Sequence, residues 1–239
     1  MNCSTPANSY KTGSYFANPR RHGGDGAFKA EHCWNLLSRL NIGIPIRRYA
    51  DVGCGSGDAT RRMVELLSSK DRLDRAVGLD ISPHVCDLSD DSIEFIHGTL
   101  PDLGATFDLV TMFDVFEHVP DATSFLRQYH GLAQIFAFHI PLEDCALYGF
   151  GNAFLERLAD PGHLLFLNPV SALNILASSG FTVLGYEYTP GFRLRESDEP
   201  VSAKERILTL ARSLTWRVSP YLLSRTFGGA SMMVIAQAL

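Results

Sequence analysis

The chain lacks the features that mark several large classes of protein. No C-x-x-C pair occurs among its five scattered cysteines, so neither a zinc knot nor a disulfide framework is indicated. No apolar run approaches the roughly 18 residues of a transmembrane helix, and the polar first residues lack the apolar region of a secretory signal. The net charge of −5 provides no overall positive field for nucleic acid. We therefore expect a cytoplasmic protein with no nucleic-acid partner and no stable membrane insertion.

The phosphate-binding loop G-x-x-x-x-G-K-[ST] is also missing, although the chain has a distinct glycine loop of another form. Gly53, Gly55 and Gly57 alternate directly after the apolar stretch 49–52, and a helical pattern follows. This order predicts a strand, a tight loop and a helix. Glycine is needed where φ is positive or where a ligand lies against the backbone. We therefore expect a small molecule at the carboxyl end of this strand.

The spacing of the loop narrows the class of ligand. The dinucleotide fingerprint is G-x-G-x-x-G, and this loop is one residue shorter. Asp51 stands ahead of the first glycine, where an acid suits a ligand with an amino group better than a pyrophosphate. A purely structural glycine turn is the alternative.

Asp80 ends the next apolar stretch, 76–80, more than about 20 residues after the glycine loop. An acid at that position can accept hydrogen bonds from two hydroxyls of a ribose. A role as a turn or helix cap is the alternative.

Strand and helix patterns alternate along the chain, which predicts parallel crossovers and a doubly wound α/β sheet. The predicted strands are 47–52, 76–80, 93–96, 107–113, 134–139, 181–188 and 232–236. The predicted helices are 27–41, 58–69, 121–129, 168–180 and 201–217. We expect residues 1–239 to form a single domain, with a lead-in over 1–45 and a helical insertion over about 190–230.

Three segments resemble motifs of the class I S-adenosylmethionine-dependent methyltransferases. Residues 51–57 match motif I, D-x-G-x-G-x-G, and 78–82 match motif II. Residues 107–121 contain F-D-x-V followed by D-V-x-E-H-V-P-D, the motif IV of the branch that acts on sugars, quinones and natural products. The Asn/Asp-Pro-Pro-aromatic motif of the amide methylases is absent, which argues against methylation of bases or glutamine. The resemblance covers roughly 27–189 and 231–238.

The resemblance implies a Rossmann-like sheet of seven strands, the last antiparallel, with helices on both faces. It also implies S-adenosylmethionine as cofactor and S-adenosylhomocysteine as product. Ile81 would pack on the adenine, while Thr99 stands where related enzymes often carry an acid for the adenine amino group. The cofactor residues that it implies are Asp51, Gly53, Gly55, Gly57, Asp80, Ile81, Thr99, Leu100, Phe113 and Asp114.

Three histidines are candidates for the base that activates an acceptor hydroxyl, because imidazole titrates near neutral pH. His118, His139 and His163 each follow or approach the predicted carboxyl edge of the sheet. His118 is favoured because motif IV borders the transferred methyl group. The D-x-x-E-H cluster that ends at His118 could instead hold a metal ion, but we predict no metal and interpret Glu117 and Asp121 as helix-start acids.

Two further segments bear on substrate access and partners. Tyr10, Tyr15, Phe16 and Lys29 belong to a lead-in that could fold over the cofactor as a lid. Residues 201–226 are basic, and we consider a solvated helix, a substrate lid or dimer contact, and a peripheral helix on anionic lipid. The protein is expected to be a monomer or a homodimer.

We therefore predict methyl transfer from S-adenosylmethionine to a small molecule, as O-methylation of a sugar or natural product. One alternative is a nicotinamide-dependent oxidoreductase, which the short glycine loop disfavours. A second is a non-catalytic S-adenosylmethionine-binding domain, which the missing acid at Thr99 would allow.

Overall fold

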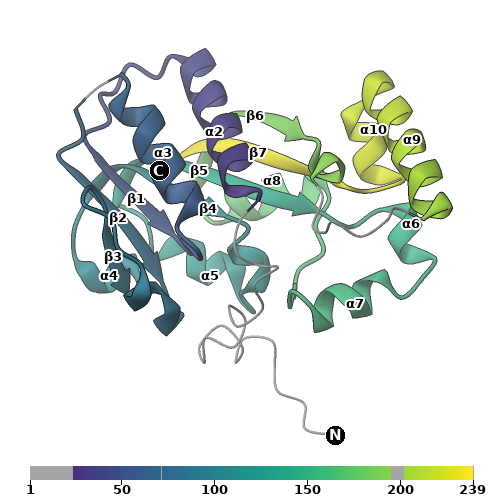
Figure 1. Ribbon diagram of the computed structural model, residues 1–239, viewed down its shortest axis with the longest axis horizontal. Coiled ribbons are helices and arrows are strands. Elements are labelled where there is room, and N and C mark those ends of the chain that lie inside the picture. Colours follow the sequence, from purple (N-terminus) through teal and green to yellow (C-terminus); the bar gives the residue numbers. More distant parts are fainter. Residues whose placement is uncertain (1–23, 71, 195–201, 239) are drawn as a thin grey trace, which may run out of the picture.

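The computed structural model describes residues 24–70, 72–194 and 202–238. These residues form one seven-stranded sheet with helices packed around it (Figure 1). The strand order is β3-β2-β1-β4-β5-β7-β6. The strands are β1 (Arg48–Val52), β2 (Arg75–Asp80), β3 (Glu94–His97), β4 (Phe107–Phe113), β5 (Ala133–Leu142), β6 (Phe181–Thr189) and β7 (Ala230–Ala238). Neighbouring strands from β3 to β5 pair in parallel, and β7 is antiparallel to both β5 and β6. The predicted fold class is confirmed.

The predicted strands agree with the structure to within three residues at each end. β4 has the bounds that the sequence predicts, and β5 is the largest extension, reaching Leu142 instead of residue 139. Pro141 ends neither the strand nor its pairing, because β5 continues opposite β7 as far as Leu142. Pairing with a distant strand therefore overrides the local break that proline would cause.

Alternate residues of the central strands supply two separate cores, one on each face of the sheet. Tyr49 and Leu109 face the core of α2 (Gly26–Leu40) and α3 (Asp58–Ser68), which lie side by side in Figure 1. Ala50 and Val110 face the core under α5 (Ala122–Arg127) and α8 (Pro169–Ser178). Helices therefore cover both faces, as a doubly wound sheet requires.

Local capping explains where several helices begin. Asp121 accepts a hydrogen bond from the Ser124 amide at the start of α5. Asn168 forms a capping box with Ser171 ahead of α8, and Pro169 follows in the first turn. Both starts agree with the sequence. The short elements η3 (Pro83–Asp87), α4 (Leu100–Leu103), η4 (Phe116–His118) and η5 (Gly191–Arg193) have too few turns to produce a periodic pattern, and the sequence did not predict them.

Four helices gather at one end of the sheet, on the right in Figure 1. They are α6 (Ala146–Gly149), α7 (Ala153–Ala159), α9 (Ala203–Val218) and α10 (Pro220–Arg225). The predicted helix over 201–217 corresponds to α9, and the predicted break at Ser219–Pro220 separates α9 from α10. One face of α9 exposes Ile207, Leu210, Leu214 and Val218. In the described part of the chain, no helix has the length and apolarity to cross a bilayer.

A buried carboxylate ties β1 to the elements on either side of it. Asp51 is 2% exposed and accepts hydrogen bonds from the hydroxyls of Thr60 on α3 and Thr111 on β4, both at 2.6 Å. The Tyr49 hydroxyl lies 2.8 Å from that of Thr111 and extends the network. Burial raises the pKa of Asp51 to about 6, although the two hydroxyl donors oppose the increase.

Replacing Asp51 with Asn should change how stability depends on pH. The folded protein holds the Asp51 proton more tightly than the unfolded chain, so this contribution is complete below about pH 4 and is lost as the pH rises through about 6. Relative to the variant, the wild type should lose about 2 kcal/mol of unfolding free energy between pH 4 and pH 7. Urea denaturation of both proteins across this pH range measures the difference. If the unfolding free energies of the wild type and Asp51→Asn changed with pH in parallel, burial would not raise the pKa of Asp51.

The core should respond to loss of an aromatic ring far more than the surface does. Phe136 is fully buried and packs edge to face on Phe181, with ring centroids 5.0 Å apart. Phe136→Ala should lower the unfolding free energy by about 3–5 kcal/mol. The matched control is Phe150→Ala, at a side chain that is 92% exposed, and it should cost about 0.5 kcal/mol or less. Equal urea midpoints for the two variants would contradict the assigned core.

Candidate active site

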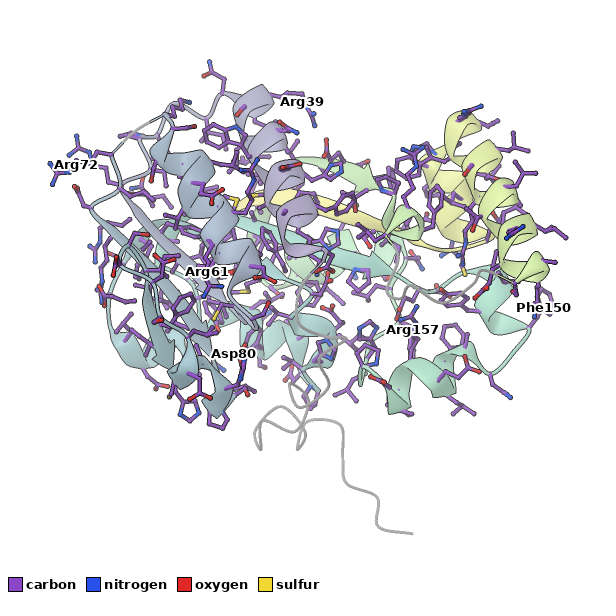
Figure 2. The ribbon with its side chains drawn as sticks, in the orientation of Figure 1. Arg39, Arg61, Arg72, Asp80, Phe150 and Arg157 are labelled. Carbon is purple, nitrogen blue, oxygen red and sulfur yellow. The ribbon has the colours of Figure 1, made fainter. Side chains whose placement is uncertain are left out.

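The candidate site lies where β1, β2, β4 and β5 end at one edge of the sheet. Parallel pairing carries Asp51, Asp80, Asp114 and His139 to or near this edge from segments far apart in the sequence. Figure 2 labels Asp80 close to the beginning of α3. Open α/β sheets bind ligands outside the carboxyl ends of their strands.

The glycine loop folds back on the end of β2. The amides of Gly53 and Cys54 donate to the Leu79 carbonyl at 2.8 and 3.0 Å. Gly53, Gly55 and Gly57 all have positive φ, at 75°, 54° and 80°. A Cβ on Gly53 would also lie 2.7 Å from the Val115 side chain. Backbone conformation and close packing therefore both require glycine here.

The Asp80 carboxylate is held in place by two backbone amides. One oxygen accepts from the Gly55 amide at 2.9 Å and the other from the Ser82 amide at 2.8 Å. Burial raises the pKa of Asp80, and the two amide donors act in the opposite direction. Each carboxylate oxygen has two lone pairs, so one remains on each oxygen for a ligand hydroxyl. This is the geometry that the predicted ribose contact needs.

The predicted adenine side of the site is assembled from two loops. Ile81 is 45% exposed, so its apolar side chain is available to a flat ring. Thr99 donates its hydroxyl hydrogen to Asp102 at 2.5 Å. Sequence reasoning missed Asp102, which brings an exposed carboxylate beside Thr99. Leu100 is fully buried in the core, so its side chain supports the loop and only its backbone can reach a ligand.

Two other predicted cofactor residues are turned away from solvent. Phe113 is 7% exposed and packs in the core beneath α2 and α3. The Asp51 carboxylate is occupied by Thr60 and Thr111, as described above. These side chains build the edge of the sheet, and their direct contact with a ligand stays a prediction.

Asp114 forms the centre of a charged network that joins β4, β5 and α2. Its oxygens lie 2.7 Å from Lys29 Nζ and 2.6 Å from His139 Nδ1. Lys29 also contacts Asp25 at 2.6 Å. Burial opposes ionisation of Asp114, but Lys29 and His139 outweigh it and hold the pKa well below its usual range. The network fixes the first turns of α2 over the candidate site.

Asp114 also has an unusual backbone conformation. Its φ is 55°, and among the described residues it and Asn41 alone have positive φ without being glycine. Asparagine and aspartate tolerate this conformation best, at a cost of order 1 kcal/mol or more. In this conformation the Asp114 side chain contacts Lys29 on α2.

The three candidate histidines occupy different environments. Both ring nitrogens of His139 are engaged, by Asp114 at 2.6 Å and by the Thr189 hydroxyl at 3.0 Å. This arrangement disfavours His139 as a base for a substrate. His118 and His163 instead pack edge to face, with ring centroids 4.8 Å apart. The structure therefore brings two of the predicted histidines together and separates the third.

Glu117 completes a cluster with His118 and His163. The ligand atoms of these three side chains lie within 4.8 Å of one another. Burial, reinforced by the charge of Asp114, raises the pKa of Glu117 well above its usual range. Burial and the neighbouring His163 lower the pKa of His118 to about 4, so its imidazole is neutral at physiological pH. Neutral imidazole can accept a proton or bind a metal ion.

Sequence reasoning missed Glu143, which supports this cluster. Its oxygens contact His163 Nδ1 at 2.6 Å and Arg157 Nε at 3.2 Å. Glu143 directly follows the end of β5 at Leu142. Its pairing with His163, twenty residues later, leaves no periodic signal in the sequence.

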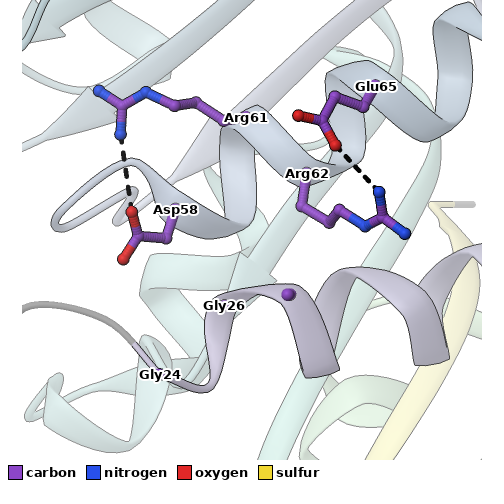
Figure 3. Close-up of a pocket in the computed structure, with 7 residues that line it drawn as sticks. Gly24, Gly26, Asp58, Arg61, Arg62 and Glu65 are labelled. Atoms are coloured by element: carbon purple, nitrogen blue, oxygen red, sulfur yellow. Dashed lines mark hydrogen bonds and ion pairs between the residues drawn. The ribbon is translucent and has the colours of Figure 1, made fainter.

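A separate cavity lies between the first turns of α2 and α3 (Figure 3). It has a volume of about 260 Å³ and is lined by Gly24, Gly26, Ala27, Asp58, Arg61, Arg62 and Glu65. Asp58 pairs with Arg61, and Glu65 pairs with Arg62. None of the predicted cofactor residues lines it, so this cavity gives no support to the cofactor assignment.

The predicted lid is only partly within the described residues. Tyr10, Tyr15 and Phe16 lie outside them, whereas Lys29 lies on α2 and forms the ion pair with Asp114. The described part of the 190–230 insertion consists of η5, α9 and α10, which lie at the far end of the sheet from β3.

Comparison with known proteins agrees with the fold and the motifs. A family model described as a methyltransferase domain matches residues 50–134. A comparison with curated proteins gave no match. A SAM-dependent methyltransferase from Archaeoglobus fulgidus has a similar structure, with a TM-score of 0.53, 18% identity and coverage of 87% of this chain and 94% of its own.

Two further solved structures are similar. The magnesium protoporphyrin IX methyltransferase of Synechocystis, with bound SAH, has a TM-score of 0.52 at 16% identity, covering 90% of this chain and 84% of its own. The plantazolicin methyltransferase BpumL, in complex with SAH, has a TM-score of 0.57 at 12% identity, covering 98% of this chain and 96% of its own. Residues 50–134, which include the glycine loop and motif IV, thus match a methyltransferase domain, and the solved methyltransferase structures share the fold of this chain.

Proposed function

We propose that this protein transfers a methyl group from S-adenosylmethionine to a hydroxyl of a small molecule, such as a sugar or natural product. The observation that carries the cofactor assignment is the Asp80 carboxylate, which two backbone amides hold against the glycine loop. Remaining lone pairs on its two oxygens suit the paired hydroxyls of a ribose. Exposed Ile81 would lie beside the attached adenine.

The methyl donor requires little covalent assistance. A sulfonium is already activated, so the protein mainly has to align donor and acceptor. A hydroxyl acceptor also benefits from a nearby base. His118 follows motif IV and is neutral at physiological pH, which makes it our candidate for this role. Its low pKa makes it a weaker base than an ordinary histidine. More of the rate enhancement therefore has to come from the positioning of donor and acceptor and from the surrounding groups.

The names of two similar enzymes support a small-molecule substrate in general. The Synechocystis and plantazolicin enzymes act on a porphyrin and on a natural product, as their names state. The choice of oxygen as acceptor atom rests on motif IV and the adjacent histidines. A cytoplasmic setting, the monomer or homodimer, and peripheral lipid contact through 201–226 remain expectations from the sequence.

Replacing Asp80 with Asn should weaken cofactor binding. The variant loses the negative charge and one of the two ligand-facing acceptors, so the Kd for S-adenosylmethionine should rise at least about tenfold. Isothermal titration calorimetry with S-adenosylmethionine and S-adenosylhomocysteine measures this change. Asp91→Asn, at an exposed acid between η3 and β3, is the matched control and should leave the Kd unchanged.

The same calorimetry with NAD distinguishes the proposed function from the main alternative, a nicotinamide-dependent oxidoreductase. Such an enzyme would bind NAD and show no binding of S-adenosylmethionine. Wild-type protein that behaves in this way would overturn the proposed function. If Asp80→Asn is folded, as judged by its thermal transition, and binds S-adenosylmethionine as tightly as the wild type, the result would contradict the ribose contact of Asp80 but not the proposed function.

Replacing His118 with Ala should reduce turnover much more than cofactor affinity. Loss of a general base lowers kcat by about 10²- to 10⁴-fold, while the Kd for S-adenosylmethionine should stay close to the wild-type value. Formation of S-adenosylhomocysteine is measured with the first hydroxyl compound that gives turnover. His32→Ala, at a histidine paired with Glu187 on β6, is the control. An unchanged kcat in His118→Ala would exclude His118 from the reaction.

A further inference from the structure

The Glu117 carboxylate is buried without the partners that such a group normally needs. Its side chain is 0% exposed, and neither oxygen has a hydrogen-bond partner from another residue in the described part of the chain. An isolated buried carboxylate is costly, and buried charges are normally paired or coordinate a metal. The ligand atoms of His118 and His163 lie within 4.8 Å of it. The Glu117 carboxylate is therefore placed to bind a cation together with these two imidazoles.

Both imidazoles are oriented as metal-ligating histidines commonly are. His118 Nδ1 lies 3.2 Å from the Gly162 carbonyl, and His163 Nδ1 lies 2.6 Å from Glu143 Oε2. In the neutral rings, donation from Nδ1 to these acceptors places the lone pair on Nε2. A carboxylate or carbonyl behind a ligating imidazole fixes its tautomer and orientation.

The backbone holds the two halves of the cluster together. The amides of Leu164 and Leu165 donate to the Glu117 carbonyl at 2.8 and 3.1 Å. This fastens the segment that carries His163 to η4, which carries Glu117 and His118. The cluster is therefore built from two segments about 45 residues apart that are joined by main-chain hydrogen bonds. The relative position of its side chains is thus set by the backbone.

We propose that Glu117, His118 and His163 bind a divalent transition-metal ion, with zinc as the preferred ion. Two imidazoles and one carboxylate suit zinc and its neighbours in the transition series, whereas magnesium and calcium favour all-oxygen sites. Asp114, which the sequence places in the same motif, is not part of the set because Lys29 and His139 occupy its oxygens. This proposal revises the sequence prediction of no metal. It does not depend on cofactor binding, but a bound ion would take the Nε2 lone pair of His118, so in the zinc-bound protein His118 is a ligand and not the base.

The geometry requires only a small adjustment. Zinc bonds of about 2.0–2.1 Å place neighbouring tetrahedral ligands roughly 3.4 Å apart. The present upper limit of 4.8 Å could close by rotation of the side chains. Three protein ligands leave one tetrahedral position open, as in catalytic zinc sites and unlike structural ones.

Titration of chelator-treated protein with zinc chloride tests the proposal directly. Calorimetry should show one zinc ion per chain in the wild type, with affinity at least tenfold weaker in Glu117→Gln and in His163→Ala. Glu143→Gln should also weaken zinc binding, by about 10- to 100-fold, through loss of support for His163. Magnesium chloride should bind far more weakly than zinc chloride.

His32→Ala is the matched control, because His32 is also paired with a carboxylate but lies outside the cluster. It should bind zinc as the wild type does. Cobalt chloride provides a second readout, since coordination by these ligands should give a visible absorption band that Glu117→Gln lacks. Circular dichroism and thermal melting without metal establish that each variant is folded.

Absence of stoichiometric zinc binding in the wild type would overturn the proposal, as would equal affinity in the wild type and the two folded ligand variants. Titration of the same samples with S-adenosylmethionine keeps the outcomes distinct. Cofactor binding without zinc binding would reject the metal site alone, and zinc binding without cofactor binding would reject the proposed function alone.

Discussion

The parallel alignment of β1, β2, β4 and β5 is the constraint on which the site depends. It brings the ends of distant segments to one edge, where the glycine loop can reach the Leu79 carbonyl and Asp80. The buried carboxylate of Asp51 then joins β1 to β4 and α3. The position of the candidate cofactor site follows from backbone pairing first and from side-chain chemistry second.

The polar side chains of motif IV belong to two separate networks. Asp114 turns toward Lys29 and His139 and secures α2 over the site. Glu117 and His118, only a few residues later, turn toward His163 and the support of Glu143. Asp114 itself has a positive φ of 55°. One short motif therefore serves both to hold a helix and to build a polar cluster.

Much of the fold was predictable because its signals are local. The bounds of β4, the caps at Asp121 and Asn168, and the break at Ser219–Pro220 all appear in short patterns. The assignment of Leu100 and Phe113 to the cofactor site stays a prediction, and the structure adds that their side chains are buried in the two cores. A motif gives the position of a residue along the chain but not which way its side chain faces.

The sequence alone determined the α/β fold, the glycine loop and the position of the acid at Asp80, since periodicity and motif spacing are properties of consecutive residues. Only the tertiary structure decided that His139 is engaged on both sides, and that His163 joins Glu117 and His118. These relations join residues 20 or more positions apart. They depend on strand order, loop path and burial, and a linear pattern carries none of these.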